Sequence, residues 1–589
     1  MTTQPPTTNI DLNGAISDCR VVRTAAEGLA LDALPGTGVD LVHMASDAMT
    51  YLLKTPRPHL DYACRFANFL GHYPPGPAGE DLVANGDSDC RMDWEYAYLR
   101  EMTGRRDGLD VDRGVRRRIL SYVTEQGYAM AAGGIYCGGE VDRAAYYISN
   151  WSTGKILYTL AETFARDGDE DARTLARKMF LALKSLATVE GDKAWFVGGS
   201  GPYLDGKWYE TFITFNYGAA TEPVLHYARL CGDEEAWDFA GMLARGTAAG
   251  IQANLGDRRV RDDGSFADHT HLHTHETWGV ADVAATLGDP ALLAWARRVY
   301  EFVRRMGGDS GFFPERMVLP GTTCWGWNGY PERVFLSETC ITGDMVSIAA
   351  CLARAGLPEY YDHIERYVRN YLHHVQFFVT PALEAYYRTR HAHLPLAEVE
   401  AGLRMLRDDY QGGFLGHVGL NDWIERAANV ELAMVGCCVP EGMRALYTAW
   451  QQAVVTDEGC TRVNMHFSRE TPQVCVRSYL PEAGRLSITM RCAGALAVRI
   501  PAWAPAGSVQ ARRNGQAEPV VLQGAYAHFS DLHAGDVLEV AYDLMACTQQ
   551  VAIGGNPESQ RLMTYAWQGN TIMGIDLAGG QFPMYPIIA

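Results

Sequence analysis

The 589-residue sequence contains no continuous apolar run of about 18 residues, so it predicts no transmembrane helix. Its polar first 14 residues, which include two prolines, lack the charged and apolar regions of a signal peptide. No run of five or more basic residues occurs, and the net charge of -19 argues against binding to nucleic acid or to an anionic membrane. We therefore expect a cytoplasmic protein that binds neither nucleic acid nor membranes.

The 14 cysteines are scattered and lack the regular spacing of a secreted disulfide framework. In a reducing compartment most cysteines behave as small buried hydrophobic residues. Cysteines that cluster with other metal ligands would be exceptions. The 47% hydrophobic and 21% charged residues are typical of a globular protein. The length suggests about two to four domains.

Residues 41–452 have the hydrophobic period of helices, and they repeat a unit of helix, glycine turn and helix. Successive turn glycines lie 64, 56 and 68 residues apart, at Gly168, Gly232, Gly288 and Gly356. Glycine suits the left-handed position after a helix, and a repeated unit indicates stacked helical hairpins. Earlier helices expected over 45–53, 92–102 and 115–126 raise the count to about twelve. We predict a closed (α/α)6 barrel, with an open solenoid as the alternative, because the loops are long and rich in aromatic residues.

Residues 453–589 have a different pattern, with alternating strands expected over 485–491, 495–500 and 537–542. We predict an antiparallel β-sandwich, which makes the whole chain an α+β multidomain protein. A linker near 453–459 would join the two parts, and the sandwich could mediate a homodimer. Residues 1–40 form an N-terminal extension that could pack on the β domain.

Two short motifs carry candidate chemistry, and each precedes a predicted helix. Glu338 and Cys340 come just before a helix over 341–352, and the pair Cys437-Cys438 precedes a helix that begins near Glu441. Zinc prefers thiolate, imidazole and carboxylate ligands, and adjacent cysteines are poorly placed to form a disulfide with each other. A helix N-terminus and a metal both lower the pKa of a thiol. The spacing alone favours buried structural cysteines over a metal site.

With these motifs the chain resembles glycoside hydrolase family 127, the β-L-arabinofuranosidase family. Four further motifs of the β region follow the order of that family: 499–504, 514–515, 524–526 and 535–538. The resemblance implies an (α/α)6 barrel followed by β-sandwich material. It also implies zinc ligands at Glu338, Cys340, Cys437 and Cys438. Cys437 would then be the nucleophile of a retaining exo-glycosidase that acts on a terminal furanose, either β-L-arabinofuranose or a related sugar.

The resemblance places the acid/base glutamate after a Gly-Gly segment, here Gly307-Gly308. Glu315 is therefore the first candidate and Glu332 the second. The structural alternative for Glu315 is a surface glutamate that pairs with Arg316.

The pocket wall departs from the family pattern. Lys155, Tyr217 and Trp278 stand at or near positions where the characterised members carry histidines. The sequence has a histidine cluster of its own over 269–275. It could line the sugar pocket, form a metal site with alternate rings of a strand on one side, or be a solvated loop. We favour the pocket, because aromatic faces beside hydrogen-bonding groups suit a sugar. The predicted substrate-binding residues are thus Lys155, Tyr217, His273, His275, Glu276, Trp278 and Trp325. A cationic Lys155 would favour an acidic sugar.

Two other functions remain open. One is an (α/α)6 sugar epimerase that uses two histidines of 269–275 as proton carriers. The other is a non-catalytic sugar-binding protein in which a closed four-ligand zinc is structural.

Overall fold

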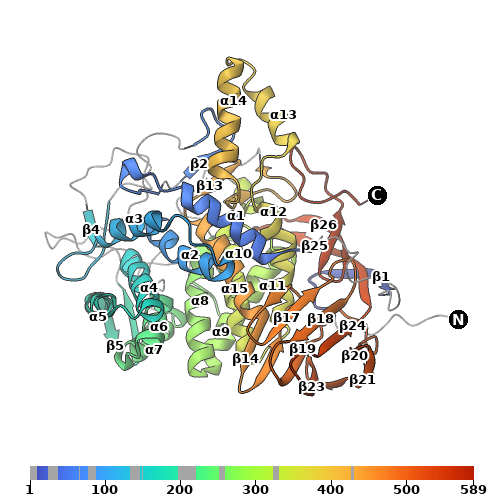
Figure 1. Ribbon diagram of the computed structural model, residues 1–589. Coiled ribbons are helices and arrows are strands. Elements are labelled where there is room, and N and C mark those ends of the chain that lie inside the picture. The colour runs from blue at the N-terminus through green and yellow to red at the C-terminus, as the bar shows by residue number, and fades with distance from the viewer. Residues whose placement is uncertain are drawn as a thin grey trace.

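The computed structural model describes residues 10–23, 38–64, 67–76, 88–132, 146–148, 150–196, 220–250, 259–322, 331–425 and 430–588 (Figure 1). Across these residues, no helix is both long and apolar enough to cross a bilayer.

Helices make up most of the chain between residues 41 and 453. The α-helices are α1 (Leu41–Lys54), α2 (Ser88–Thr103), α3 (Leu109–Leu120), α4 (Asn150–Asp167), α5 (Glu170–Ser185), α6 (Thr221–Cys231), α7 (Glu234–Ala248), α8 (Thr270–Leu287), α9 (Pro290–Met306), α10 (Thr339–Arg354), α11 (Tyr360–Tyr367), α12 (His373–Val375), α13 (Pro381–Arg390), α14 (Leu396–Met405) and α15 (Cys438–Ala453). Shorter helical segments are η1 (Pro58–Leu60), η3 (Pro331–Phe335), η4 (Val368–Leu372) and η5 (Leu406–Tyr410).

The predicted glycine turns are confirmed, and they join α4 to α5, α6 to α7, α8 to α9 and α10 to α11. Gly168, Gly232 and Gly288 each have a φ of 69°, and Gly356 has a φ of 98°. This left-handed backbone is strained for residues with a Cβ. The aspartate that follows each of the first three glycines then caps the second helix with its side chain.

The first helices of these four hairpins form a ring together with α2 and α15. Neighbours in contact run in the order α2, α4, α6, α8, α10, α15 and back to α2. The partner helices α3, α5, α7, α9 and α11 pack on α2, α4, α6, α8 and α10, respectively, and α1 packs on α2 and α15. The N-terminal ends of α8, α10 and α15 therefore belong to three consecutive members of the ring.

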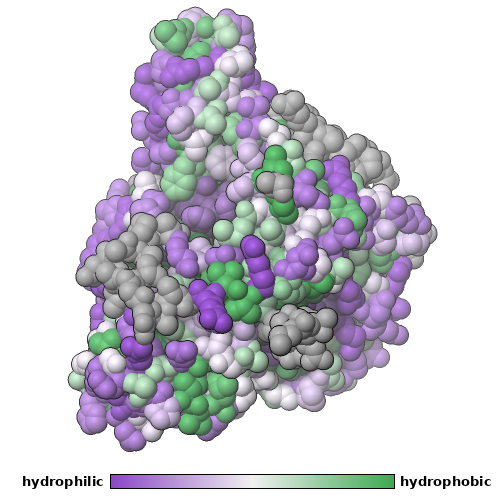
Figure 2. Space-filling model, turned by 90° about the vertical axis from the view of Figure 1, so that its right-hand side faces the viewer, coloured by the Kyte–Doolittle hydropathy of each residue, from purple (hydrophilic) through white to green (hydrophobic). Residues whose placement is uncertain are grey.

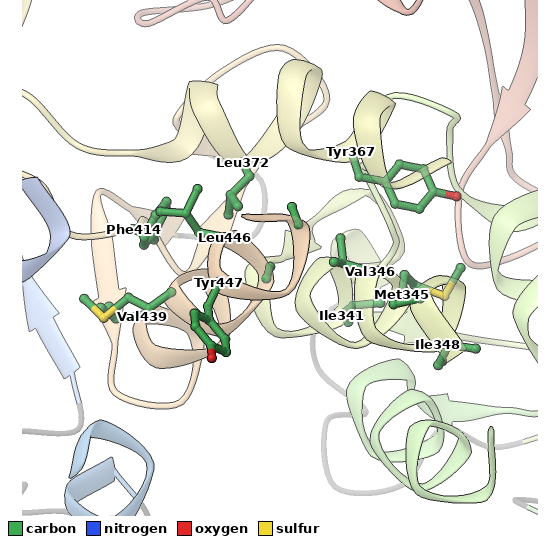
Figure 3. Packing of buried hydrophobic residues seen from close by; sticks show 14 of the residues in the cluster. Ile341, Met345, Val346, Ile348, Tyr367, Leu372, Phe414, Val439, Leu446 and Tyr447 are labelled. Atoms are coloured by element: carbon green, nitrogen blue, oxygen red, sulfur yellow. The ribbon is translucent and has the colours of Figure 1, made fainter. Parts of the chain in front are cut away.

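Helices α10 and α15 pack directly on each other within the buried core, part of which Figure 3 shows. Ile341, Val346 and Ile348 of α10, and Val439 and Leu446 of α15, are all fully buried. Burial of each such side chain stabilises the fold by about 1.5–3 kcal/mol. This contact fixes the position of one helix start relative to the other.

Two sheets of the C-terminal region share one hydrophobic cluster. One has the strand order β14-β15-β19-β23-β22, in which β15 and β19 are parallel, and the other is the antiparallel sheet β16-β17-β18-β24-β20-β21. Their bounds are β14 (Val454–Asp457), β15 (Cys460–Val463), β16 (Arg469–Glu470), β17 (Val474–Ser478), β18 (Arg485–Met490), β19 (Gly494–Arg499), β20 (Gln510–Arg513), β21 (Gln516–Glu518), β22 (Val521–Gln523), β23 (Tyr526–Leu532) and β24 (Val537–Ala541). The three predicted strands are confirmed as β18, β19 and β24.

A further antiparallel sheet packs on the helical core rather than on this cluster. It contains β1 (Ala15–Val22), β25 (Leu544–Ile553), β26 (Arg561–Gln568) and β27 (Thr571–Ile575), in that order. The remaining strands form pairs: β2 (Ala67–Phe69) with β13 (Ala433–Val435), β3 (Met130–Ala132) with β4 (Tyr146–Ile148), β5 (Ala187–Glu190) with β6 (Lys193–Phe196), β7 (Asp268–His269) with β8 (Arg316–Met317), β9 (Ser337–Glu338) with β10 (His417–Val418), and β11 (Ile424–Glu425) with β12 (Val430–Glu431).

Two sequence-based boundaries were wrong. The helix predicted over 115–126 begins at Leu109 and ends at Leu120, and the residues after it turn back so that Val123 pairs with Ala129. The linker predicted over 453–459 is mostly strand β14, which pairs with β15 through a glycine turn. The polar run Thr456-Asp457-Glu458 before Gly459 gives this short segment the composition of a loop, but Val454 is part of a buried cluster.

The helices α13 and α14 project from the rest of the molecule, at the top of Figure 1 and, after rotation about the vertical axis, at the top of Figure 2. No sequence pattern predicted this projection. Both helices are short, and Leu396 at the start of α14 is 71% exposed.

Candidate metal centre and active site

The two sequence motifs meet where α10 and α15 begin. Glu338 is the N-cap residue of α10, and Cys437 is the N-cap residue of α15. The helices approach closely at Gly343, where an added Cβ would lie 2.7 Å from the carbonyl oxygen of Glu441. This approach brings Cys340 of one helix beside Cys438 of the other.

The ligand atoms of Glu338, Cys340, Cys437 and Cys438 all lie within 4.8 Å of one another, and all four residues are buried. The Sγ atom of Cys438 is 3.2 Å from that of Cys340 and 3.7 Å from that of Cys437. It is also 3.7 Å from Oε1 of Glu338. Two thiolates bound to a tetrahedral zinc at about 2.3 Å stand about 3.8 Å apart. The residues therefore fit a metal ion that takes three thiolates and one carboxylate.

The three thiols are not equivalent. Burial raises the pKa of Cys340 and of Cys438 well above the usual value for a thiol. Hydrogen bonds from these two thiols lower the pKa of Cys437 well below that value, against the effect of burial. Cys437 is 9% exposed, whereas the other two are 0% exposed. Of the three sulfur atoms, that of Cys437 is thus the best placed to react.

Three backbone segments lie side by side next to the cysteines. The amide of Glu315 donates to the carbonyl of Leu336, and the amide of Thr270 donates to the carbonyl of Glu315. As a result one ligand atom each of His269, Glu315 and Glu338 lies within 4.8 Å of the others. The Nε2 atom of His269 is 2.6 Å from Oε2 of Glu338. Although burial opposes it, the charge of His269 and this hydrogen bond hold the pKa of Glu338 below its usual range.

Glu315 is 3% exposed, so the alternative of a surface glutamate is wrong. Its Oε1 atom accepts a hydrogen bond of 2.5 Å from Nη1 of Arg333 and lies 3.7 Å from Nε of Arg316, which itself pairs with Asp268 at 2.9 Å. Its buried Oε2 atom has no hydrogen-bond partner among the described residues. The backbone of the second candidate, Glu332, lies in η3, but its side chain lies outside the described residues.

After His269, which ends strand β7, the histidine cluster is neither a strand nor a solvated loop. Residues 270–275 form the first turns of α8, so His271 and His275 lie one helical turn apart on the same face. The Nδ1 atoms of both rings face Asp344, at 2.7 Å and 3.4 Å. These three residues have the composition of a metal site. However, Arg444 also donates to Asp344 at 3.0 Å, and such cations disfavour a second metal there.

Several predicted pocket residues have partners within the protein. Lys155 is 1% exposed, its Nζ atom lies 3.2 Å from Nε2 of His275, and its pKa is lowered to about 8, first by burial and then by the charge of Arg91. The ring of Trp278 is covered by the guanidinium of Arg444, 3.8 Å from the ring centroid.

Of the other predicted pocket residues, the structure describes the side chains of His273 and Glu276. His273 is buried against Phe266, with ring centroids 4.1 Å apart. Glu276 is half-buried on α8. Tyr217 and Trp325 lie outside the described residues.

The sequence-based interpretation missed a buried ionic network behind the cysteines. Arg91 of α2 donates to Glu441 at 2.8 Å, and Glu441 also pairs with Arg444. Arg444 in turn donates to Asp344, which lies four residues after Cys340. This helical spacing places Asp344 on the same face as Cys340 and could have indicated it. No local pattern could have indicated Arg91, because its partner is far away in the sequence.

No family model matches the sequence, and no curated protein matches it. Solved structures do match. The structure of a glycoside hydrolase family 127 β-L-arabinofuranosidase from Geobacillus stearothermophilus has a TM-score of 0.54 at 14% identity, over 89% of this chain and 80% of that one. A second family 127 β-arabinofuranosidase has a TM-score of 0.54 at 14% identity, over 90% and 81% of the two chains. At this identity the likeness shows a shared fold, and it confirms the resemblance to the family at that level.

Proposed function

We propose that the protein is a retaining exo-glycoside hydrolase with a zinc-bound cysteine nucleophile. The observation that carries this proposal is the convergence of Glu338, Cys340, Cys437 and Cys438, with Glu315 beside Glu338. The fold shared with two β-arabinofuranosidases supports a glycosidase and a carbohydrate substrate. We further propose that the ring of six helices is an (α/α)6 barrel over 41–452 and that 453–589 includes a β-sandwich. The compartment and a homodimer stay predictions.

In the proposed reaction, Sγ of Cys437 attacks the anomeric carbon of a terminal furanose. The bond from this carbon to the leaving oxygen breaks, and Glu315 donates a proton to that oxygen. Glu315, now a carboxylate, then takes a proton from water, and the water oxygen displaces the thiolate. Two displacements at one carbon retain its configuration. Zinc, when bound, supplies the positive charge that stabilises Cys437 as a thiolate.

The first substrate candidate is a β-L-arabinofuranoside, and an acidic furanose is the second. An acidic sugar would need a cation, and Lys155 is the residue that suggested one. Because Lys155 is 1% exposed and contacts His275, a sugar would reach it only if these side chains moved. A neutral sugar is therefore the better-supported candidate.

Hydrolysis of aryl furanosides, followed by NMR of the first-formed sugar anomer, tests the proposal. We expect turnover with retention of configuration, and loss of turnover in Cys437→Ser. Inversion, or full activity in Cys437→Ser, would contradict the mechanism. A metal-containing protein that binds sugars but hydrolyses no glycoside would instead be the non-catalytic binding protein, because a closed four-ligand zinc is the usual structural arrangement.

The epimerase alternative receives less support. It needs two histidines that are free to contact a sugar. The Nδ1 atoms of His271 and His275 face Asp344, and their Nε2 atoms face Arg91 and Lys155, respectively.

A further inference from the structure

The two carboxylate oxygens of Glu338 face different partners. Oε1 lies 3.7 Å from Sγ of Cys438, on the side of the cysteines. Oε2 lies 2.6 Å from Nε2 of His269, a short distance that indicates a charge-assisted hydrogen bond. An oxygen that accepts such a bond is a poor second ligand for a metal. The contact with His269 thus leaves Glu338 with one oxygen for the metal.

His269 is held firmly where it makes this contact. It ends strand β7, opposite Arg316 of β8. Its amide donates to Oδ1 of Asp268 at 2.8 Å, and Arg316 donates to the same oxygen at 2.9 Å. Asp268 has a φ of 112°, which is a strained value for a residue with a Cβ. Such strain persists only where the surroundings over-determine the backbone.

The helix that follows is fixed from the other side. The side chains of His271 and Thr274 of α8 each lie 2.7 Å from Oδ2 of Asp344, one turn after Cys340 on α10. The start of α8 is therefore bound directly to the helix that carries Glu338 and Cys340. The position of His269 relative to Glu338 is set by contacts on both flanks.

We propose that His269 is a positioning residue that keeps Glu338 a one-oxygen ligand and so keeps the metal four-coordinate. The inference rests on the metal centre of the proposed function, but it concerns the coordination geometry and not the reaction. Without the hydrogen-bond donor, Oε2 is released, so the carboxylate can turn or bind through both oxygens. Partners of metal ligands of this kind typically contribute about 10–100-fold to metal affinity.

The test compares His269→Leu, which removes the donor, with His269→Gln, whose amide can still donate. Zinc affinity is measured by competition with a chromophoric chelator, and geometry by the visible spectrum of the cobalt(II)-substituted protein. We expect His269→Leu to bind zinc about 10–100-fold more weakly and to lose the intense bands of tetrahedral cobalt. His269→Gln should retain both properties to within a few-fold. The matched control is His226→Leu, which breaks another buried pair, His226 with Glu162 at 2.8 Å, on α6 and α4.

Unchanged zinc affinity and an unchanged cobalt spectrum in His269→Leu would overturn the inference. The cobalt-substituted wild-type protein provides a test that requires no variant to fold, because a five- or six-coordinate spectrum there also overturns it. If the wild-type protein binds no zinc, the proposed function fails instead, so the two failures are distinguishable.

Discussion

Gly343→Ala should weaken metal binding by forcing apart the two helices that carry the ligands. An added Cβ would lie 2.7 Å from the carbonyl oxygen of Glu441, whereas ordinary contacts begin at 3.4 Å. The neighbouring atom is backbone, so no side chain can turn away. Because Glu338 and Cys340 stand on one helix and Cys437 and Cys438 on the other, relief of the clash separates the two halves of the ligand set.

The geometry gives the size of the effect. To relieve the contact, α10 and α15 must move apart by about 0.7 Å. A binding site tolerates displacements of its ligands of only about 0.5 Å. Overpacking of this kind costs about 1–3 kcal/mol, and the higher helix propensity of alanine returns about 1 kcal/mol. We therefore expect a modest change in the thermal unfolding of the metal-free protein. Zinc affinity should fall about tenfold, which corresponds to about 1.4 kcal/mol.

Chelator competition measures the zinc affinity, and Gly241→Ala on α7 is the control. At Gly241 the nearest atom to an added Cβ is Nη1 of Arg245, at 3.3 Å, and this flexible side-chain end can move. Gly241→Ala should bind zinc like the wild-type protein. Equal zinc affinity in folded Gly343→Ala would refute the claim that the packing of α10 and α15 sets the ligand geometry.

Three other outcomes follow from the site. Glu315→Gln should lower kcat/KM by about 10²–10⁴-fold for glycosides with poor leaving groups, and far less for activated aryl glycosides; equal losses across a leaving-group series would contradict an acid role. Removal of the metal with a strong chelator should abolish hydrolysis and lower the thermal unfolding temperature, and zinc should restore both; full activity of verified metal-free protein would contradict a zinc-dependent reaction. Burial raises the pKa of Glu222 to about 7 from an ordinary value of 4.5. The folded protein therefore binds the carboxyl proton of Glu222 more tightly than the unfolded chain does, and this contribution to stability is lost as pH rises from about 4.5 to about 7. Glu222→Gln should remove that part of the pH dependence, as measured by unfolding temperature against pH, and an identical profile in wild type and variant would contradict it.

Local chemistry in the sequence predicted a large part of the fold. Glycine turns at 168, 232, 288 and 356 were identified because a left-handed residue after a helix strongly favours glycine. The motifs around Glu338 and Cys437 are visible because each places two possible ligands close together in the sequence, but the resemblance to family 127, and not this spacing, assigned them to a metal.

The metal-site and loop alternatives for the histidine cluster assumed the wrong secondary structure, and the reason is physical. His269, His271, His273 and His275 alternate with period two, which indicates a strand, yet the segment from Thr270 is helical. In the helix the same spacing separates the rings: His271 and His275 face Asp344, whereas His273 packs on Phe266.

Long-range partners could not be predicted. Arg91 pairs with Glu441, 350 residues away. The extension over 1–40 was expected to pack on the β domain, but the sequence did not indicate that its strand β1 pairs with β25. Such contacts depend on how whole elements pack, and one sequence carries no local trace of them. The same limit applies to His269, whose contact with Glu338 requires three separate backbone segments to lie side by side.

The central claim, that Cys437 is a nucleophile, is tested most directly by intact-mass analysis after incubation with a furanose analogue that is reactive at its anomeric carbon. We predict a single adduct that maps to the peptide containing Cys437 and is absent from Cys437→Ser. An active protein that forms no adduct, or an adduct that persists in Cys437→Ser, would contradict the account.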